Sequence, residues 1–388
     1  MSVWNDLVGQ EPLVALLRQA VTAAQQRLAG GSGTGMTHAW LFTGPPGSGR
    51  SNAARAFAAA LQCERGGCGT CNACRTSLSG AHPDVTLFKT DRMQILVDEI
   101  RALVPRAATR PGNGRWQVIV VEDADRLNER ASDALLKSLE EPASRTVWML
   151  CAPSVEDLQV PTVRSRCRQV SLRTPPAEAI TRLLVEREGV PQGIAAFAAR
   201  ASHGHIGRAR RLATDEDARN RRREIVSLAP ALVDLGACMT AAQNLHETAK
   251  EDAAAVSARL DEAEVSELAQ GWGVAPGVRV RAPRGYLGAT SELREDQRRR
   301  ARRVVTDSID GALLELLSFY RDVLVVQAGA ASALVNEEMC TEVATVARRG
   351  GAEQTLRRIE AIGACREALT ANAAPLLALE SLMLSLRL

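Results

Sequence analysis

Aromatic side chains are scarce in this sequence. Tryptophan, tyrosine and phenylalanine make up 3% of the 388 residues, whereas 46% of the residues are hydrophobic. The core must therefore be built mainly from aliphatic side chains. The scarcity also argues against a protein that holds single-stranded nucleic acid by stacking bases on aromatic rings. The net charge of +3 is too small to demand a nucleic-acid partner by itself.

The sequence also lacks long apolar runs and an even distribution of cysteine. No run approaches the roughly 20 apolar residues that span a bilayer. The first residues, Met1 to Asp6, lack the basic start and apolar stretch of a signal peptide. Four of the nine cysteines fall within residues 63–74 and the others are scattered, which is not typical of a disulfide scaffold. We therefore expect a cytoplasmic protein without membrane contact.

Residues 1–173 alternate short apolar runs with helical patterns, which predicts an α/β domain with a mostly parallel sheet. Strands are expected at 38–43, 85–89, 116–121 and 146–152, and helices at 94–104 and 129–141. The prolines at 175 and 176 interrupt this alternation. Three short helices, at 176–189, 191–202 and 204–212, then predict a small helical lid domain over residues 174–214.

Residues 215–388 show only helical patterns and predict an all-α domain with a charged insertion at about 250–303. A charged, alanine-rich helix is expected at 249–268 and a loop at 271–292, where Gly, Pro, Ser and Thr are frequent. Six arginines follow between positions 294 and 303. They are consistent with a solvated helix face or with a surface that contacts phosphates.

The segment Gly44-Pro45-Pro46-Gly47-Ser48-Gly49-Arg50-Ser51 matches the phosphate-binding loop G-x-x-x-x-G-K-[ST] except at Arg50, which replaces lysine. It lies between an expected strand and an expected helix, where backbone N–H groups and a helix N-terminus face phosphates. Arginine keeps the charge, but it is a bulkier fork than the compact lysine ammonium. Binding of ATP with Mg²⁺ by Gly44, Gly47, Gly49, Arg50 and Ser51 is thus possible, and its hydrolysis is in doubt.

The strand at 116–121 ends in Glu122 and Asp123. A working ATPase of this type has the order Asp-Glu, in which Asp helps to hold Mg²⁺ and Glu orients the attacking water. The reversed order puts a longer side chain at the metal position and a shorter one at the water position. Displacements of about 1 Å can lower a rate by about 10²-fold. The alternative is that both acids form the solvated end of a strand.

Cys63, Cys68, Cys71 and Cys74 supply four thiolates within twelve residues. In a reducing compartment this spacing favours a structural Zn²⁺ site, and four ligands leave no open position for catalysis. Free cysteines and an iron–sulfur cluster are the alternatives.

The phosphate loop, the cysteine cluster and the acidic strand are followed by the motifs Leu135-Leu136-Lys137-Ser138-Leu139-Glu140-Glu141-Pro142 and Ser165-Arg166-Cys167. In this order they resemble the bacterial clamp-loader branch of the AAA+ ATPases, the subunits of DNA polymerase III. The delta-prime type is more similar than the gamma/tau type. The resemblance is strong to about residue 173, moderate to Leu212, and weak beyond it.

The resemblance implies a hetero-pentameric ring with gamma/tau and delta subunits, which loads a sliding clamp onto primed DNA. It also implies that Arg166 acts in trans, as an arginine finger in a neighbour's ATP site, and that residues 215–388 form the collar. An active motor subunit carries a lid arginine in a G-x-x-R pattern, where this sequence has Gly207, with Arg208 one residue late. Arg50, the reversed acids and Gly207 together predict a stator subunit with little or no ATPase activity of its own.

Two other functions remain open at this stage. The first is an ATP-hydrolysing motor of the gamma/tau type, supported by the otherwise intact loop and the two acids. The second is a zinc-dependent nucleic-acid-binding module, suggested by the arginine-rich stretch. Turnover by the isolated chain would favour the first, and salt-dependent DNA affinity would favour the second.

Overall fold

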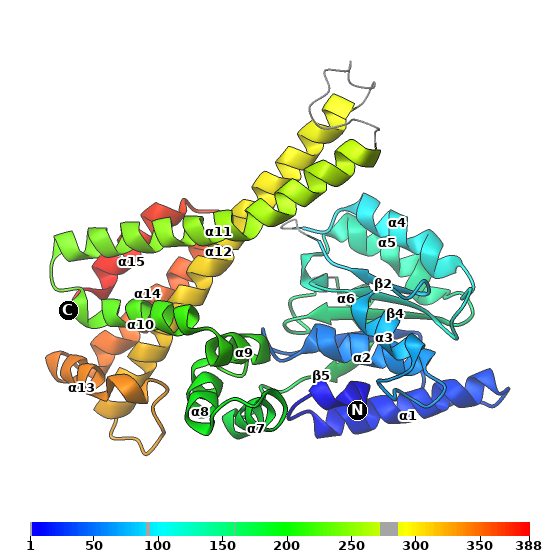
Figure 1. The fold of residues 1–388 in the computed structure, drawn as a ribbon, viewed down its shortest axis with the longest axis horizontal. Coiled ribbons are helices and arrows are strands. Elements are labelled where there is room, and N and C mark those ends of the chain that lie inside the picture. Colours follow the sequence, from blue (N-terminus) through cyan, green and yellow to red (C-terminus); the bar gives the residue numbers. More distant parts are fainter. Residues whose placement is uncertain (1, 91–93, 159, 272–285) are drawn as a thin grey trace. The chain divides into compact units, whose positions relative to one another are not determined.

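The computed structural model describes residues 2–90, 94–158, 160–271 and 286–388 (Figure 1). Contacts within the chain divide it into two compact units, Met1–Thr214 and Asp215–Leu388. The expected loop at 271–292 falls largely on residues 272–285, outside the described residues. Among the described residues, no helix combines the length and the apolar character that crossing a membrane requires.

A five-stranded parallel sheet forms the centre of the first unit. Its strands lie in the order β2-β3-β4-β1-β5. They are β1 (Ala39–Thr43), β2 (Val85–Phe88), β3 (Gln117–Val121), β4 (Thr146–Ala152) and β5 (Arg168–Ser171). Every residue of β1, β3 and β4 is buried, because helices cover both faces of the sheet. The predicted α/β class is confirmed, and β5 is an additional edge strand that the sequence analysis missed.

Alternate side chains of the strands point to two separate cores. Trp40, Phe42 and Val118 pack with α1 (Glu11–Leu28) and α2 (Arg50–Gln62) on one face. The opposite face, which includes Leu41 and Ile119, packs with α4 (Val97–Ala108), α5 (Glu129–Glu140) and α6 (Pro161–Arg166). The buried side of α2 is mostly alanine, which lets this helix lie close to the sheet and fixes the loop at its N-terminus.

Three short helices complete the first unit, as the sequence predicts. They are α7 (Ala177–Glu188), α8 (Gln192–Ala201) and α9 (Ile206–Thr214). The side-chain amide of Gln10 pairs with the backbone of Arg173, donating to its carbonyl at 2.6 Å and accepting its N–H at 3.1 Å. This pair ties the start of α1 to the segment that leads into α7. The domain boundary at residue 173 stays a prediction.

The second unit is helical throughout its described residues. Its helices are α10 (Glu216–Ala231), α11 (Leu235–Gly271), α12 (Tyr286–Gln327), α13 (Cys340–Arg349), α14 (Ala352–Thr370) and α15 (Pro375–Leu386). Helices α11 and α12 run side by side and extend beyond the other helices of this unit (Figure 1). Because α12 begins at Tyr286, residues 286–292 are helical and the expected loop is wrong there. The predicted helical C-terminal region is confirmed.

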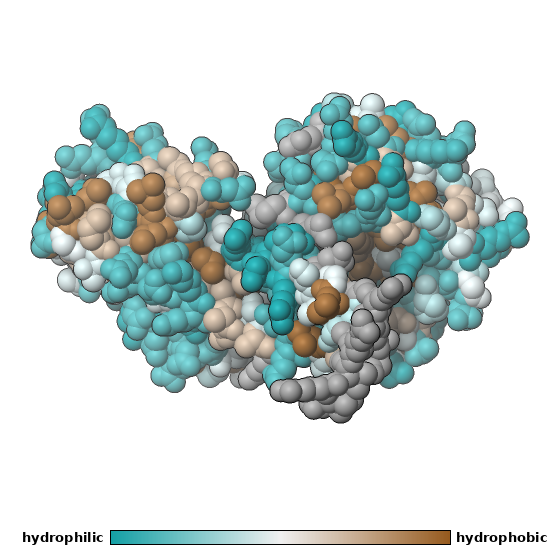
Figure 2. Space-filling model, turned by 90° about the horizontal axis from the view of Figure 1, so that it is seen from above, coloured by the Kyte–Doolittle hydropathy of each residue, from teal (hydrophilic) through white to brown (hydrophobic). Residues whose placement is uncertain are grey.

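Apolar residues at the surface are dispersed. Seen from above in Figure 2, the surface is largely hydrophilic, and the apolar residues form separate patches. Among the described residues, the most exposed large hydrophobic side chains are Leu287, at 75%, and Leu377, at 67%. Single exposed leucines of this kind are common on protein surfaces.

Candidate functional site

The phosphate-binding loop joins β1 to α2 and depends on its glycines. Gly44, Gly47 and Gly49 have φ angles of 154°, 83° and 93°, a region that side chains rarely tolerate. A Cβ at Gly44 would lie 2.7 Å from Ser48 Oγ and 2.8 Å from the carbonyl oxygen of Leu172. The N-terminus of α2 at Arg50 opens onto this loop, which is the arrangement that binds phosphate in related loops.

The side chain of Arg50 folds back and contacts the backbone of the phosphate-binding loop. Its Nη1 donates a hydrogen bond of 2.8 Å to the carbonyl oxygen of Gly44, at the first residue of the loop. The guanidinium therefore satisfies a backbone acceptor of its own chain. A lysine ammonium at this position would reach outward as a point charge toward the phosphates.

Glu122 already has a cationic partner. Arg55, five residues after Arg50 on α2, donates from Nη2 to Glu122 Oε1 at 2.7 Å and from Nε at 3.1 Å. The Glu122 side chain is 10% exposed and the Arg55 side chain 35%, so the carboxylate is shielded from water and the guanidinium is partly open to it. The neighbouring Asp123 adopts a left-handed conformation with φ 55°. The negative charge of Glu122, the carboxylate expected to approach Mg²⁺, is thus compensated by Arg55 of the same chain.

His205 covers the loop from the lid side. A Cβ at Gly47 would lie 2.3 Å from Cγ of His205, so the imidazole occupies the space directly over this glycine. Removal of water from the ring, and next the nearby positive charge of Arg208, lower the pKa of His205. Gly207, at the position of the expected lid arginine, is exposed and offers no side chain.

These contacts test the fit of Mg²⁺-ATP to the loop. The backbone has the form of a phosphate loop, but the cation at position 50 and the acid at position 122 are engaged elsewhere, and His205 lies over Gly47. The side chains as arranged do not fit a bound nucleotide with its metal. Binding would require Arg50, Arg55 and His205 to leave their partners.

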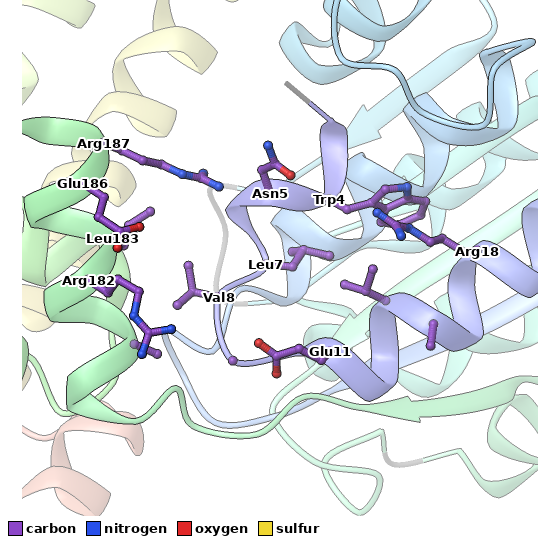
Figure 3. A pocket seen from close by; sticks show the side chains of 14 residues that line it. Trp4, Asn5, Leu7, Val8, Glu11, Arg18, Arg182, Leu183, Glu186 and Arg187 are labelled. Atoms are coloured by element: carbon purple, nitrogen blue, oxygen red, sulfur yellow. The ribbon is translucent and has the colours of Figure 1, made fainter.

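An open cleft of about 470 Å³ lies between the N-terminal segment and α7 (Figure 3). Leu7 and Val8 supply apolar surface on one side, and Arg182 and Leu183 line the other. At its rim, Nη1 of Arg187 pairs with Asp6 Oδ1 at 3.0 Å. This ion pair is exposed and contributes little energy, but it marks the contact between α7 and the 3-10 helix Val3–Asp6.

The four clustered cysteines converge as predicted. Their sulfur atoms lie within 4.8 Å of one another, and Cys63 Sγ is 3.7 Å from both Cys68 Sγ and Cys71 Sγ. A disulfide needs about 2.05 Å, whereas a tetrahedron with Zn–S bonds of about 2.3 Å has edges of about 3.8 Å. Hydrogen bonds from Thr70 lower the pKa of Cys68 to about 5, whereas burial raises the pKa of Cys74, so the fit rests on the geometry of the sulfur atoms. The four residues therefore fit a structural zinc ion.

The cysteine loop also holds the start of the chain. The backbone N–H of Val3 donates to the carbonyl oxygen of Gly67 at 3.1 Å, and the hydroxyl of Ser2 donates to the same oxygen at 3.0 Å. Trp4 Nε1 donates to the carbonyl oxygen of Gly66 at 3.3 Å. Three bonds thus join the segment that precedes α1 to the turn between Cys63 and Cys68.

Arg166 ends helix α6 at the surface of the first unit. Its Nη2 pairs with Glu140 Oε1 at 2.5 Å, and its Nη1 donates to the carbonyl oxygen of Thr162 at 2.9 Å. The two neighbouring arginines have other partners. Arg164 donates to the carbonyl oxygen of Val155, and Arg168 donates to that of Gly35 and lies 5.0 Å from the ring centre of Trp40. The three arginines therefore make different contacts and do not form a uniform basic loop.

Two family profiles match the chain in separate segments. The profile described as "DNA polymerase III, delta subunit" matches residues 20–176, and that of "DNA polymerase III, delta subunit, C terminal" matches residues 305–387. Together they cover more than half of the sequence. The chain belongs to the family of DNA polymerase III clamp-loader subunits.

Curated relatives agree with this clamp-loader assignment. The delta-prime subunit of Pseudomonas aeruginosa is 36% identical over 40% of this chain and 53% of its own length. The gamma/tau subunit of Mycobacterium tuberculosis is 31% identical over 48% of this chain and 32% of its own. A solved gamma subunit-related protein of Thermotoga maritima is 13% identical, with a TM-score of 0.38, over 95% of this chain and 98% of its own. The chain spans about half the length of the delta-prime relative.

Three contacts at the candidate site escaped the sequence analysis. Arg55 neutralises Glu122, His205 covers Gly47, and Glu140 holds Arg166. Arg55 could have been suspected, because it follows the loop on the same helix and precedes the acid-ended strand. No local pattern marks His205 or Glu140, since each acts on a segment distant in the sequence.

Proposed function

We propose that this chain is a delta-prime-like stator of the DNA polymerase III clamp loader. It takes part in ATP-driven loading of the sliding clamp onto primed DNA during replication in the cytoplasm. Its partners are gamma/tau and delta subunits in a hetero-pentamer, with the clamp and DNA met through the assembled complex. Its own contribution is Arg166, which enters the ATP site of a neighbouring motor subunit.

The position of Arg166 is the observation that carries this proposal. It is partly exposed at the end of a short helix, and its surface partner, Glu140, is itself half-exposed. Arg164 and Arg168 donate to backbone carbonyls, as Arg166 does to Thr162, but it is Arg166 that pairs with the carboxylate of Glu140. A guanidinium held at the surface by one half-exposed carboxylate and the carbonyl oxygen of Thr162 can exchange these for phosphate oxygens. This suits a role in trans, where an arginine raises the rate of phosphoryl transfer by about 10³–10⁵.

The phosphate loop supports the stator rather than the motor. Arg50 and Glu122, the groups that would act on Mg²⁺-ATP, are satisfied by Gly44 and Arg55, and no arginine occupies the lid position at Gly207. The four cysteines would hold zinc as a structural ion.

The test is the ATPase activity of a complex assembled from this chain with its gamma/tau and delta partners, in the presence of clamp and primed DNA. Arg166→Ala should lower turnover at the served site by tenfold or more, and Arg166→Lys should recover little, because it keeps the charge without the fork. Arg164→Ala is the matched control. Normal turnover in the Arg166→Ala complex would overturn the role of Arg166, and robust ATP turnover by the isolated chain would favour the gamma/tau-like motor.

A further inference from the structure

The outer parts of α11 and α12 form an arm that the collar core does not use. We define the arm as residues 250–271 of α11 and 286–303 of α12. The buried core of the second unit takes residues of α11 only up to Ala249, and residues of α12 only from Val305 onward. The two family profiles end at residue 176 and resume at residue 305. Apart from its base, where Asp252 pairs with Arg221 of α10 and Ala253 is buried, the arm lies outside the packed bundle, and all of it lies outside the segments shared with the family.

Charge is unevenly divided between the two helices of the arm. By sequence, residues 250–271 carry six acids and two bases, whereas residues 286–303 carry six arginines and three acids. This asymmetry explains how the helices pair. Arg300 Nη2 lies 2.5 Å from Asp261 Oδ1, and its Nη1 lies 2.6 Å from Glu264 Oε1. Gln297 donates to Glu264 on the same side at 3.2 Å.

Three of the six arginines are occupied by such contacts. Arg300 binds the acids of α11, Arg299 pairs with Asp296 on its own helix, and Arg303 pairs with Asp307 at 3.6 Å. These arginines stabilise the arm. Because their positive charge is compensated by these acids, they are poorly placed to bind an anionic partner.

The other three arginines form a separate row, which we call the arginine stripe: Arg294, Arg298 and Arg302. They are exposed, and among the described residues none of them is in an ion pair. Their spacing of four residues aligns them along one face of α12 over about 12 Å. At about 100° per residue, Arg298 lies about 160° around the helix from Arg300, so the stripe faces away from α11.

We propose that the arginine stripe binds the phosphate backbone of duplex DNA. Guanidinium groups make paired hydrogen bonds to phosphate oxygens, and about 12 Å matches three to four phosphates along one strand at 3.4 Å per step. The choice of DNA as the partner rests on the proposed function, which brings primed DNA to the assembled complex. Tyr286 is the only aromatic residue in the described part of the arm, so backbone contact is favoured over base stacking.

A protein partner fits the stripe less well. Protein interfaces have an apolar centre with few charges, whereas the stripe presents three charges in succession. On its side of α12, the described large apolar residue is Leu287, about 10 Å before Arg294 along the helix. Leu287 provides the control that separates the two kinds of partner.

The test measures binding of the full chain to a fluorescent duplex of about 25 base pairs between 50 and 200 mM salt. Three phosphate contacts predict a slope of log affinity against log salt of about −2.7, or about a 40-fold loss of affinity over this range. Arg294→Gln/Arg298→Gln/Arg302→Gln should weaken binding by more than tenfold at 100 mM salt and flatten the slope by about 2.7. Glutamine retains helix propensity, and circular dichroism checks the arm.

Two controls keep the result specific. Arg348→Gln/Arg349→Gln/Arg357→Gln removes the same charge from exposed positions elsewhere in this unit and should leave both slope and affinity unchanged. Leu287→Ala should also bind duplex normally. Equal losses in the two arginine variants would overturn the proposal, as would wild-type protein that fails to bind duplex at 50 mM salt. The measurement needs no partner subunit or ATP, so its failure is distinct from failure of the Arg166 test.

Discussion

Arg55 and Glu122 form an ion pair of 2.7 Å at the edge of the sheet where β3 ends. The pair places a fixed side-chain cation beside the acid that a working ATPase of this type uses near Mg²⁺. It links the helix that follows the phosphate loop to the acidic strand 67 residues later. The pair thereby joins α2, the helix that follows the loop, to the end of β3, and gives Glu122 a structural role in the first unit.

Removal of Arg55 should destabilise the first unit. Arg55→Ala leaves Glu122 largely buried without a partner, and the free energy of unfolding should fall by about 1–3 kcal/mol. Urea denaturation followed by circular dichroism measures the change. Arg55→Ala/Glu122→Gln should recover part of the loss because no buried charge remains. A double variant as unstable as the sum of the two single variants would contradict the pairing.

Restoration of the loop lysine alone should not create an ATPase. In Arg50→Lys the sequence matches the phosphate-loop pattern, but Glu122 still pairs with Arg55 and Gly207 still lacks the lid arginine. We expect phosphate release by this variant to stay at the background measured for the unchanged protein. If turnover rises clearly above that background, substitution at position 50 is the main block and the pairing of Glu122 is not.

Zinc should be bound in a ratio of one ion per chain and should stabilise the first unit. Cys68→Ser removes one ligand, and a loss on the order of 3 kcal/mol would lower the melting temperature by roughly 6–12 °C for a unit of this size. Metal analysis and calorimetry report the two effects. Cys340→Ser changes an exposed cysteine outside the cluster and serves as the control. Unchanged metal content in Cys68→Ser would argue against the four-thiolate site.

Stability should fall as the pH drops below about 6.5. Burial lowers the pKa of His82, whose Nδ1 accepts the backbone N–H of Asp84 at 3.1 Å, and desolvation lowers that of His205. The unfolded chain then binds protons that the folded chain does not. The stabilisation is complete above the unfolded pKa of about 6.5 and is lost as the pH falls toward the folded values.

Denaturation curves between pH 7.5 and 5.5 measure this dependence. His82→Gln should reduce the slope by up to about 1.4 kcal/mol per pH unit. His38→Gln is the comparison, since Nε2 of His38 donates to the carbonyl oxygen of Leu139 at 2.7 Å in a part-buried setting. Identical slopes for the unchanged protein and His82→Gln would show that His82 does not contribute.

The sequence predicts the parts of the fold whose signal is local. The strands β1, β3 and β4 are buried on both sides and therefore read as apolar runs. The edge strand β5 exposes three of its four residues and includes Arg168 and Gln169, so it has no such signal. The expected loop extended too far because Gly288, Thr290 and Ser291 lie in the first turns of α12.

The distinction between local and long-range signals also applies to the candidate site. The phosphate loop and the four cysteines are each contained within about a dozen residues, so spacing alone predicts them. The contacts of Glu122 with Arg55 and of Arg166 with Glu140 join different helices and strands. They depend on how these elements pack together, and no local pattern encodes that packing.

The cysteine turn is bonded to Ser2, Val3 and Trp4, and the segment they begin reaches α7 through the ion pair of Asp6 with Arg187. The cysteine cluster is thus joined through the N-terminal segment to α7 by three hydrogen bonds and one exposed ion pair. A change in the geometry of four sulfur atoms would displace the anchor of that segment. Loss of the cluster would therefore also release the hydrogen bonds that hold Ser2, Val3 and Trp4.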